Sequence, residues 1–139
     1  TDMKELLKIL LVCTLSSVAA FAAHHEQPTV VPVEIWTCNL NEGKTLDDVR
    51  KVSNMVAKVT EKLGIPTAQW LFSPFTGNMD TSRFMLMTGW SDFNGMGKGF
   101  DGFFIKNAGA EVMVEWAATA TCESRNLLLV ENTFNQIEG

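Results

Sequence analysis

The chain has 139 residues, of which 46% are hydrophobic and 19% charged, a composition typical of a globular domain rather than a disordered chain. Its 11 Lys and Arg residues are scattered, and its formal net charge is -5. Surfaces that bind nucleic acid usually gather basic side chains on one face, so we expect no nucleic-acid partner.

The N-terminal segment is typical of a secretory signal peptide. A short basic region leads into an apolar run from Ile9 to Ala20, which ends in the small-residue pattern Ala20-Phe21-Ala22. This run is shorter than the roughly 20 apolar residues that a membrane-spanning helix needs. We therefore expect cleavage after Ala22, an exported protein that is periplasmic or secreted, and no stable membrane insertion afterwards.

Three segments follow from this interpretation. The leader covers residues 1–22, and its Thr1 and Asp2 precede the first methionine and are expected to be non-native. Residues 23–32 contain two prolines and no periodicity, which predicts an extended tail. Residues 33–139 are expected to form a single domain.

The first half of that domain predicts a strand followed by a helix. Val33–Cys38 is β-branched and aromatic with an alternating pattern, which favours a strand. Apolar residues then recur at three- and four-residue steps from Leu46 to Leu63, which indicates an amphipathic helix. Thr45 and Asp48 have the spacing of a capping box, and Gly64 is typical of a left-handed helix end.

The second half predicts three strands and two helical pieces. Ala68–Ser73 and Arg83–Trp90 flank a turn and favour an antiparallel hairpin. Apolar spacing predicts a helix through Phe93–Phe103, although its glycines require close packing or a break. Ala110–Ala120 is alanine-rich and favours a short helix, with a strand as the alternative, and Arg125–Glu131 is predicted to be a buried final strand.

The element order β-α-β-β-α-β predicts an α+β fold of the ferredoxin-like kind, with one antiparallel four-stranded sheet, both helices on one face and the other face open. In this topology the first and last strands are neighbours, which brings Cys38 near Cys122. A disulfide between them is expected in an exported chain, and two buried free thiols are the alternative. The bridge would stabilise the fold by about 3 to 4 kcal/mol.

The chain resembles the dimeric α+β-barrel superfamily, whose best-known members are the antibiotic-biosynthesis-type monooxygenases. The resemblance covers Val33–Glu131 and rests on element order and on the segment from Phe84 to Phe93, which joins a predicted strand to a predicted helix. That segment is similar to the family's aromatic strand followed by a helix that begins after a tryptophan. The resemblance implies a homodimer in which two sheets pack their open faces together, as an exposed apolar sheet face also favours.

Some monooxygenases of this superfamily use an Asn and a Trp around an electron-rich substrate, without a metal or flavin of their own. The resemblance places Asn39 and Trp70 in comparable positions, and Arg83 is a third polar candidate for catalysis. The chain has no Tyr, and its only two histidines, His24 and His25, lie in the predicted tail. We therefore expect no cofactor, and the sequence leaves open whether the protein is an enzyme.

Large apolar side chains on the predicted strands are candidates for a ligand pocket. Met85 and Met87 share one face of their strand, because side chains alternate along a strand. Together with Trp70 and Trp90 they are expected to bind a small apolar ligand. Packing in the core or at the dimer interface is the alternative explanation for the two tryptophans.

Two further patterns resemble known motifs. His24 and His25 near a processed N-terminus are compatible with a Cu(II) site, although an unstructured polar tail explains them better, and we expect no metal. Gly97–Gly102 matches G-x-G-x-x-G, but it lies inside a predicted helix rather than directly after a strand. A dinucleotide site is therefore excluded, and close helix packing explains the glycines.

Three functional hypotheses remain. The first is a homodimer that binds a small apolar ligand, either between sheet and helices or at the dimer interface. The second is an enzyme similar to the cofactor-independent monooxygenases. The third is a structural assembly protein, in which side chains fill the space that a ligand would take.

Overall fold

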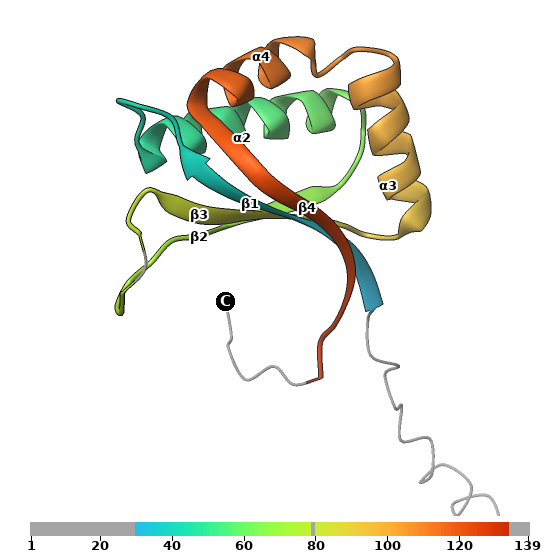
Figure 1. Cartoon of the computed structure of the whole chain (residues 1–139). Helices are drawn as coiled ribbons and strands as arrows, with labels where there is room; N and C mark the ends of the chain where they lie inside the picture. The colour runs from blue at the N-terminus through green and yellow to red at the C-terminus, as the bar shows by residue number, and fades with distance from the viewer. Residues whose placement is uncertain (1–29, 79, 134–139) are drawn as a thin grey trace, which may run out of the picture.

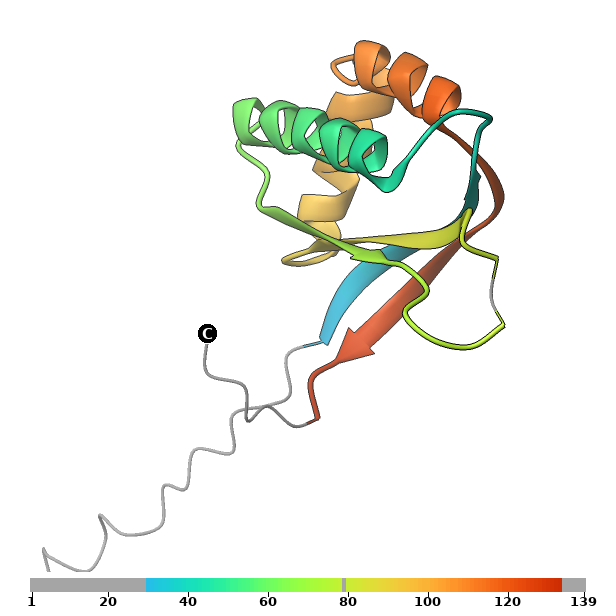
Figure 2. The same cartoon turned by 90° about the vertical axis from the view of Figure 1, so that its left-hand side faces the viewer.

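The strands pair into one antiparallel sheet in the computed structural model, which describes residues 30–78 and 80–133. Its strands are β1 (Val30–Leu40), β2 (Thr67–Phe72), β3 (Arg83–Trp90) and β4 (Ala120–Glu131), and their spatial order is β2-β3-β1-β4. The helices gather on one side of the sheet and leave the other side open (Figures 1 and 2). The predicted ferredoxin-like α+β fold is therefore confirmed.

Helix α2 (Leu46–Lys62) begins and ends where its sequence pattern predicts. The backbone N–H and the hydroxyl of Thr45 both donate to Oδ2 of Asp48 at 3.0 Å. A hydrogen bond from Lys51, together with these bonds, lowers the pKa of Asp48 to about 2. Gly64 follows the helix with a φ of +66°, the left-handed conformation that glycine adopts without strain.

The second helical region is broken into three pieces, α3 (Phe93–Phe100), the π-helical η1 (Asp101–Ile105) and α4 (Ala110–Thr119). Its glycines allow close packing, as expected. A Cβ at Gly99 would lie 3.0 Å from Nε1 of Trp90, and a Cβ at Gly102 would lie 2.9 Å from Cδ1 of Leu63. Close packing therefore favours glycine at two of the three glycines of the G-x-G-x-x-G pattern, whereas a Cβ at the first, Gly97, would meet no atom within 4 Å.

The predicted limits of the outer strands need correction. β1 begins at Val30 rather than Val33, and β4 begins at Ala120 rather than Arg125, because the two strands pair from Val30 opposite Glu131 to Leu40 opposite Ala120. The prediction that the last strand is buried is wrong. β4 is an edge strand whose outer half reaches past the helices, which leaves its leucines exposed.

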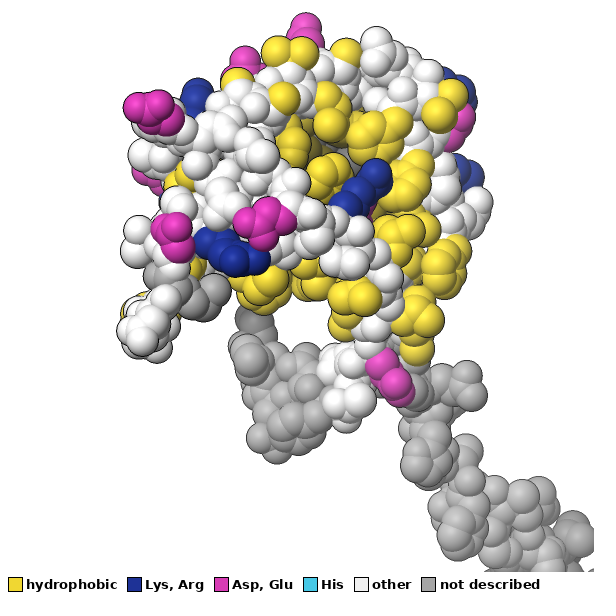
Figure 3. Space-filling model, in the orientation of Figure 1, with side chains coloured by type: hydrophobic (Ala, Val, Ile, Leu, Met, Phe, Trp, Pro, Cys, Tyr) yellow, Lys and Arg dark blue, Asp and Glu magenta, His cyan; other side chains and the backbone are white. Residues whose placement is uncertain are grey.

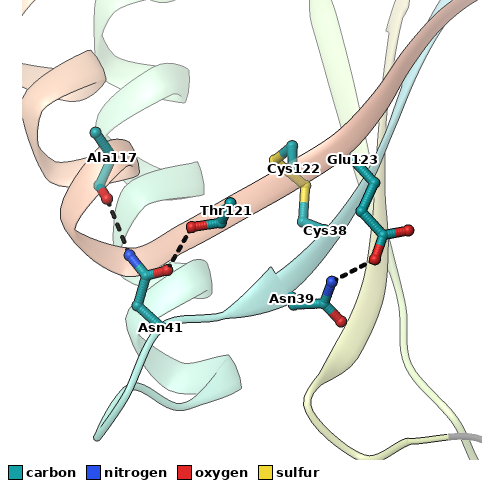
Figure 4. Close-up of a disulfide and its surroundings, with 7 residues drawn as sticks. All are labelled: Cys38, Asn39, Asn41, Ala117, Thr121, Cys122 and Glu123. Atoms are coloured by element: carbon teal, nitrogen blue, oxygen red, sulfur yellow. Dashed lines mark hydrogen bonds between the residues drawn. A yellow bond between two sulfur atoms is a disulfide. The ribbon is translucent and has the colours of Figure 1, made fainter.

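The predicted disulfide between Cys38 and Cys122 is confirmed and joins β1 to β4 (Figure 4). Asn41, just after β1, connects the end of this strand to α4 and β4. Its Nδ2 donates to the carbonyl of Ala117 at 3.0 Å, and its Oδ1 accepts from the Thr121 hydroxyl at 2.8 Å. The buried core between sheet and helices is built around Cys38, Val49, Val52, Phe84, Leu86, Val112, Trp116 and Ala120.

Several predictions concern residues outside the described ranges. The leader (1–22), His24 and His25, and all of the tail (23–32) before Val30 lie outside them. Within residues 30–78 and 80–133, no helix is long and apolar enough to cross a membrane.

Candidate ligand-binding cavity

A row of polar side chains crosses the helix-covered face of the sheet. Glu34 on β1 lies opposite Thr88 on β3, and Thr88 lies opposite Gln69 on β2. Because side chains alternate along each strand, these three point toward the helices together with their second neighbours Trp36 and Trp90. The result is a polar row flanked by aromatic rings.

A cavity of about 90 Å³ lies between this row and the helices. The space-filling view shows a hollow bordered by hydrophobic side chains, with a basic side chain beside it (Figure 3). Its lining includes Glu34, Thr88 and Gln69. Its aromatic walls come from both strands and helices: Trp36, Trp90, Phe100, Phe103, Phe104 and Trp116.

The only acidic side chain among the residues that line the cavity is Glu34, which is 4% exposed. Nε of Arg125, on β4, donates to Oε1 of Glu34. The same guanidinium lies over Trp36, with 4.9 Å between its carbon and the ring centroid, and over Phe100 at 5.2 Å. Burial lowers the pKa of Arg125, but an arginine stays protonated in proteins. Arg125 therefore neutralises the buried carboxylate and covers one side of the aromatic wall.

Gln69 has an unused hydrogen-bond acceptor. Its Nε2 donates to Oγ1 of Thr88 at 2.9 Å, while its Oε1 is buried and has no partner among the described residues. Two further hydroxyls of the lining are paired, since Thr67 donates to Thr60 at 3.0 Å and Thr60 donates to the carbonyl of Val56 at 3.1 Å. Buried polar atoms are normally hydrogen-bonded, so Gln69 Oε1 is an exception within this cavity.

The four residues predicted to bind a ligand are divided between the two faces of the sheet. Trp90 lines the cavity. Trp70, Met85 and Met87 alternate with the cavity-facing residues and lie on the open face, where Trp70 is 47% exposed. The structure thus places Trp70 and the two methionines on one face of the sheet and Trp90 on the other.

The polar candidates Asn39 and Arg83 lie opposite each other, near the end of β1 and at the start of β3. Both bind Glu123: Nδ2 of Asn39 donates to its Oε1 at 2.7 Å (Figure 4), and a guanidinium nitrogen of Arg83 donates to its Oε2 at 2.8 Å. Neither residue lines the cavity, and Trp70 does not line it either. A catalytic role for these three residues stays a prediction.

Sequence reasoning missed Glu34, Gln69 and Arg125. A signal was present for Glu34, because it shares the face of Trp36 two residues away, and a charged residue on a buried strand face is unusual. Gln69 and Arg125 carried no such signal. Within the described ranges, no three or more His, Cys, Asp or Glu side chains are grouped so that they could hold a metal ion.

The fold and the cavity together define a ferredoxin-like α+β protein with an aromatic-walled pocket between sheet and helices. No family profile and no curated protein matches the chain. Among solved structures, it is similar to SnoaB, a cofactor-independent oxygenase from Streptomyces nogalater, with 13% identity, a TM-score of 0.50, and coverage of 77% of this chain and 97% of SnoaB.

Two other solved structures are similar to this chain. A protein of unknown function from Nitrosomonas europaea has 13% identity and a TM-score of 0.48, over 80% of this chain and 97% of that one. A dimeric ferredoxin-like protein of unknown function from Thermobifida fusca has 11% identity and a TM-score of 0.45, over 73% and 92%. The likeness to SnoaB confirms the fold that the sequence resemblance implied.

Proposed function

We propose that this protein is an exported homodimer that binds a small, largely apolar ligand in the cavity between sheet and helices. The observation that carries the proposal is the cavity itself, which has aromatic walls and a few polar groups at one side. Small-molecule sites in proteins have this character, because apolar walls supply affinity and a few polar groups supply orientation.

The volume of the cavity limits the size of the ligand. On the same measure a bound water occupies about 10–15 Å³, so a cavity of about 90 Å³ has room for about six to nine non-hydrogen atoms. The aromatic walls favour a flat ring, since rings pack against one another edge to face. The expected ligand is therefore one substituted aromatic ring or two fused rings.

The open face of the sheet supports a homodimer. Trp70, Phe72 and Met85 are all exposed there, and Leu128 on the outer half of β4 extends the same face. A contiguous apolar surface of this kind is unusual on a soluble monomer. A second copy that packs sheet against sheet would cover it. The disulfide between Cys38 and Cys122 supports export, because structural disulfides persist in oxidising compartments.

The ligand proposal is tested with 4-fluorotoluene as a probe, followed by fluorine NMR. The wild-type protein is expected to bind it, and Val56→Phe, which fills the cavity from α2, is expected to abolish binding. Ser53→Leu, at a second lining position on α2, is expected to weaken it. Val59→Phe is the matched control, because Val59 lies on α2 and packs on the core without lining the cavity.

Each variant is first checked for the wild-type circular dichroism spectrum. Wild-type protein that binds neither this probe nor its phenol analogue, 4-fluorophenol, would refute the proposal, and so would cavity-filling variants that bind the probe as well as the control does. The hypothesis of a structural assembly protein predicts that the wild-type protein binds neither compound.

A cofactor-independent oxygenase is the second candidate, and the buried carboxylate favours it. Glu34 lies within the aromatic cavity, where a carboxylate can accept a proton from an acidic, electron-rich substrate. Hydroquinone fits the size limit and serves as the probe. This candidate predicts oxygen uptake above the spontaneous rate, lost in Glu34→Gln and kept in Glu115→Gln, an exposed control. Equal rates with and without protein would count against it.

A further inference from the structure

The chemical class of the ligand can be narrowed from a buried, unpaired acceptor that belongs to the cavity lining, an inference that rests on the proposed function. Gln69 Oε1 is buried, has no partner among the described residues, and belongs to a side chain that lines the cavity. The bond from its Nε2 to Thr88 holds the amide in place. The acceptor is therefore held in position before any ligand arrives.

Three neighbouring donors are engaged with other partners. Arg125 donates to Glu34, the Thr67 hydroxyl donates to the Thr60 hydroxyl, and the Thr60 hydroxyl donates to the carbonyl of Val56. A ligand that carries a hydrogen-bond donor would remove the cost of burying the unpaired oxygen. A ligand without one would leave that cost in place.

The sheet register places an aromatic ring beside the acceptor. Gln69 lies opposite Thr88, so Trp90 is its diagonal neighbour on the same face, within reach of a large side chain. Glu34 forms the other end of the polar row, and Trp36 flanks the row on the side opposite Trp90. A flat ring between the two tryptophans can direct an edge substituent toward β2, where Gln69 lies.

We propose that the cavity selects an uncharged aromatic compound that carries a hydroxyl or N–H group, and that Gln69 Oε1 is the acceptor that distinguishes it from its hydrocarbon analogue. A site built around a hydrogen bond rejects analogues that lack the donor, since its own buried polar group is then left unpaired. Gln69 is thus a specificity-determining residue.

The test compares 4-fluorophenol with 4-fluorotoluene, which have nearly the same shape and differ in the donor. Both are titrated by fluorine NMR against the wild type and Gln69→Met, a substitution of similar size that removes the acceptor. We expect Gln69→Met to weaken 4-fluorophenol binding about threefold to tenfold, the effect of one hydrogen bond. Binding of 4-fluorotoluene is expected to stay equal or to tighten.

Two controls keep the result interpretable. Leu71→Met makes a similar substitution on the same strand and the same face, at a residue that does not line the cavity, and should leave both affinities unchanged. In the wild-type protein, the side-chain amide resonance of Gln69 should shift with 4-fluorophenol and not with 4-fluorotoluene. That measurement needs no variant.

The outcomes separate this inference from the proposed function. If both probes bind the wild type and Gln69→Met changes their two affinities by the same factor, the cavity binds ligands but the role proposed for Gln69 is wrong. The same conclusion follows if the Gln69 amide resonance responds equally to both probes. If neither probe binds the wild type, the proposed function and this inference fail together.

Discussion

The two faces of the sheet are built from similar residues but have different surroundings. On β3, Phe84 and Leu86 are buried beneath the helices, whereas Met85 between them is 39% exposed on the other face. All three side chains are apolar, so their chemistry alone does not determine which is buried. Coverage by a second layer makes the difference, and the described residues supply no such layer on one of the two faces.

The faces also differ in where their polar groups lie. The covered face carries Glu34, Thr88 and Gln69 in a row through the middle of the sheet. On the open face, Asn39 and Arg83 lie at one end with Glu123, and the apolar residues continue beyond them. Under the proposed function, the first arrangement orients a ligand and the second leaves an apolar surface for a partner copy.

The largest effect on the covered face is expected from loss of the disulfide. Replacing Cys38 and Cys122 together by Ser should lower the free energy of unfolding by about 3 to 4 kcal/mol, because the unfolded chain regains the freedom that the bridge removes. Urea denaturation followed by tryptophan fluorescence measures it. Reductant should destabilise the wild type and leave the double variant unchanged. An unaltered midpoint in the double variant would contradict the prediction.

The next effect concerns the buried ion pair. Arg125→Ala leaves the Glu34 carboxylate without its cation, and we expect a loss of about 1 to 3 kcal/mol in unfolding free energy. Adding Glu34→Gln should recover part of this loss, because a neutral amide is less costly to bury. A double-mutant cycle by urea denaturation measures the coupling. Strictly additive losses would show that the pair does not couple.

The expected dimer interface on the open face is tested by introducing a charged side chain there. Met85→Glu should convert the expected dimer to a monomer, while the free energy of unfolding of the monomer changes by less than about 0.5 kcal/mol, as for most exposed substitutions. Light scattering coupled to gel filtration measures the mass. Val114→Glu, on the exposed side of α4, is the control and should remain dimeric. A wild-type monomer would refute the dimer itself.

The smallest effect is expected far from either face, at the start of α2. Hydrogen bonds from Lys51 and Thr45 lower the pKa of Asp48 from 3.8 to about 2, so its contribution to stability is complete above its ordinary pKa and is lost as the pH falls through about 2. Asp48→Ala should therefore have a lower Tm than the wild type at neutral pH, with the difference shrinking toward pH 2. A difference that does not depend on pH would contradict this.

Local sequence patterns determined the parts of the fold that depend on near neighbours. The helix from Leu46 ends at Lys62, just before Gly64, as its spacing and capping residues predict, and the β3 limits, Arg83–Trp90, were predicted residue for residue. The element order then sufficed for the sheet topology, and topology alone brought Cys38 beside Cys122. These features follow from backbone preferences and chain connectivity, which a sequence carries directly.

The cavity was decided only by the tertiary structure. Register places Gln69 opposite Thr88, and the layer of helices determines that Trp90 is enclosed while Trp70 is exposed. The same layer stops short of the outer half of β4, so the leucines that the sequence suggested were buried are exposed. Burial depends on what packs against a residue from elsewhere in the chain, and a side chain's own hydrophobicity does not supply that information.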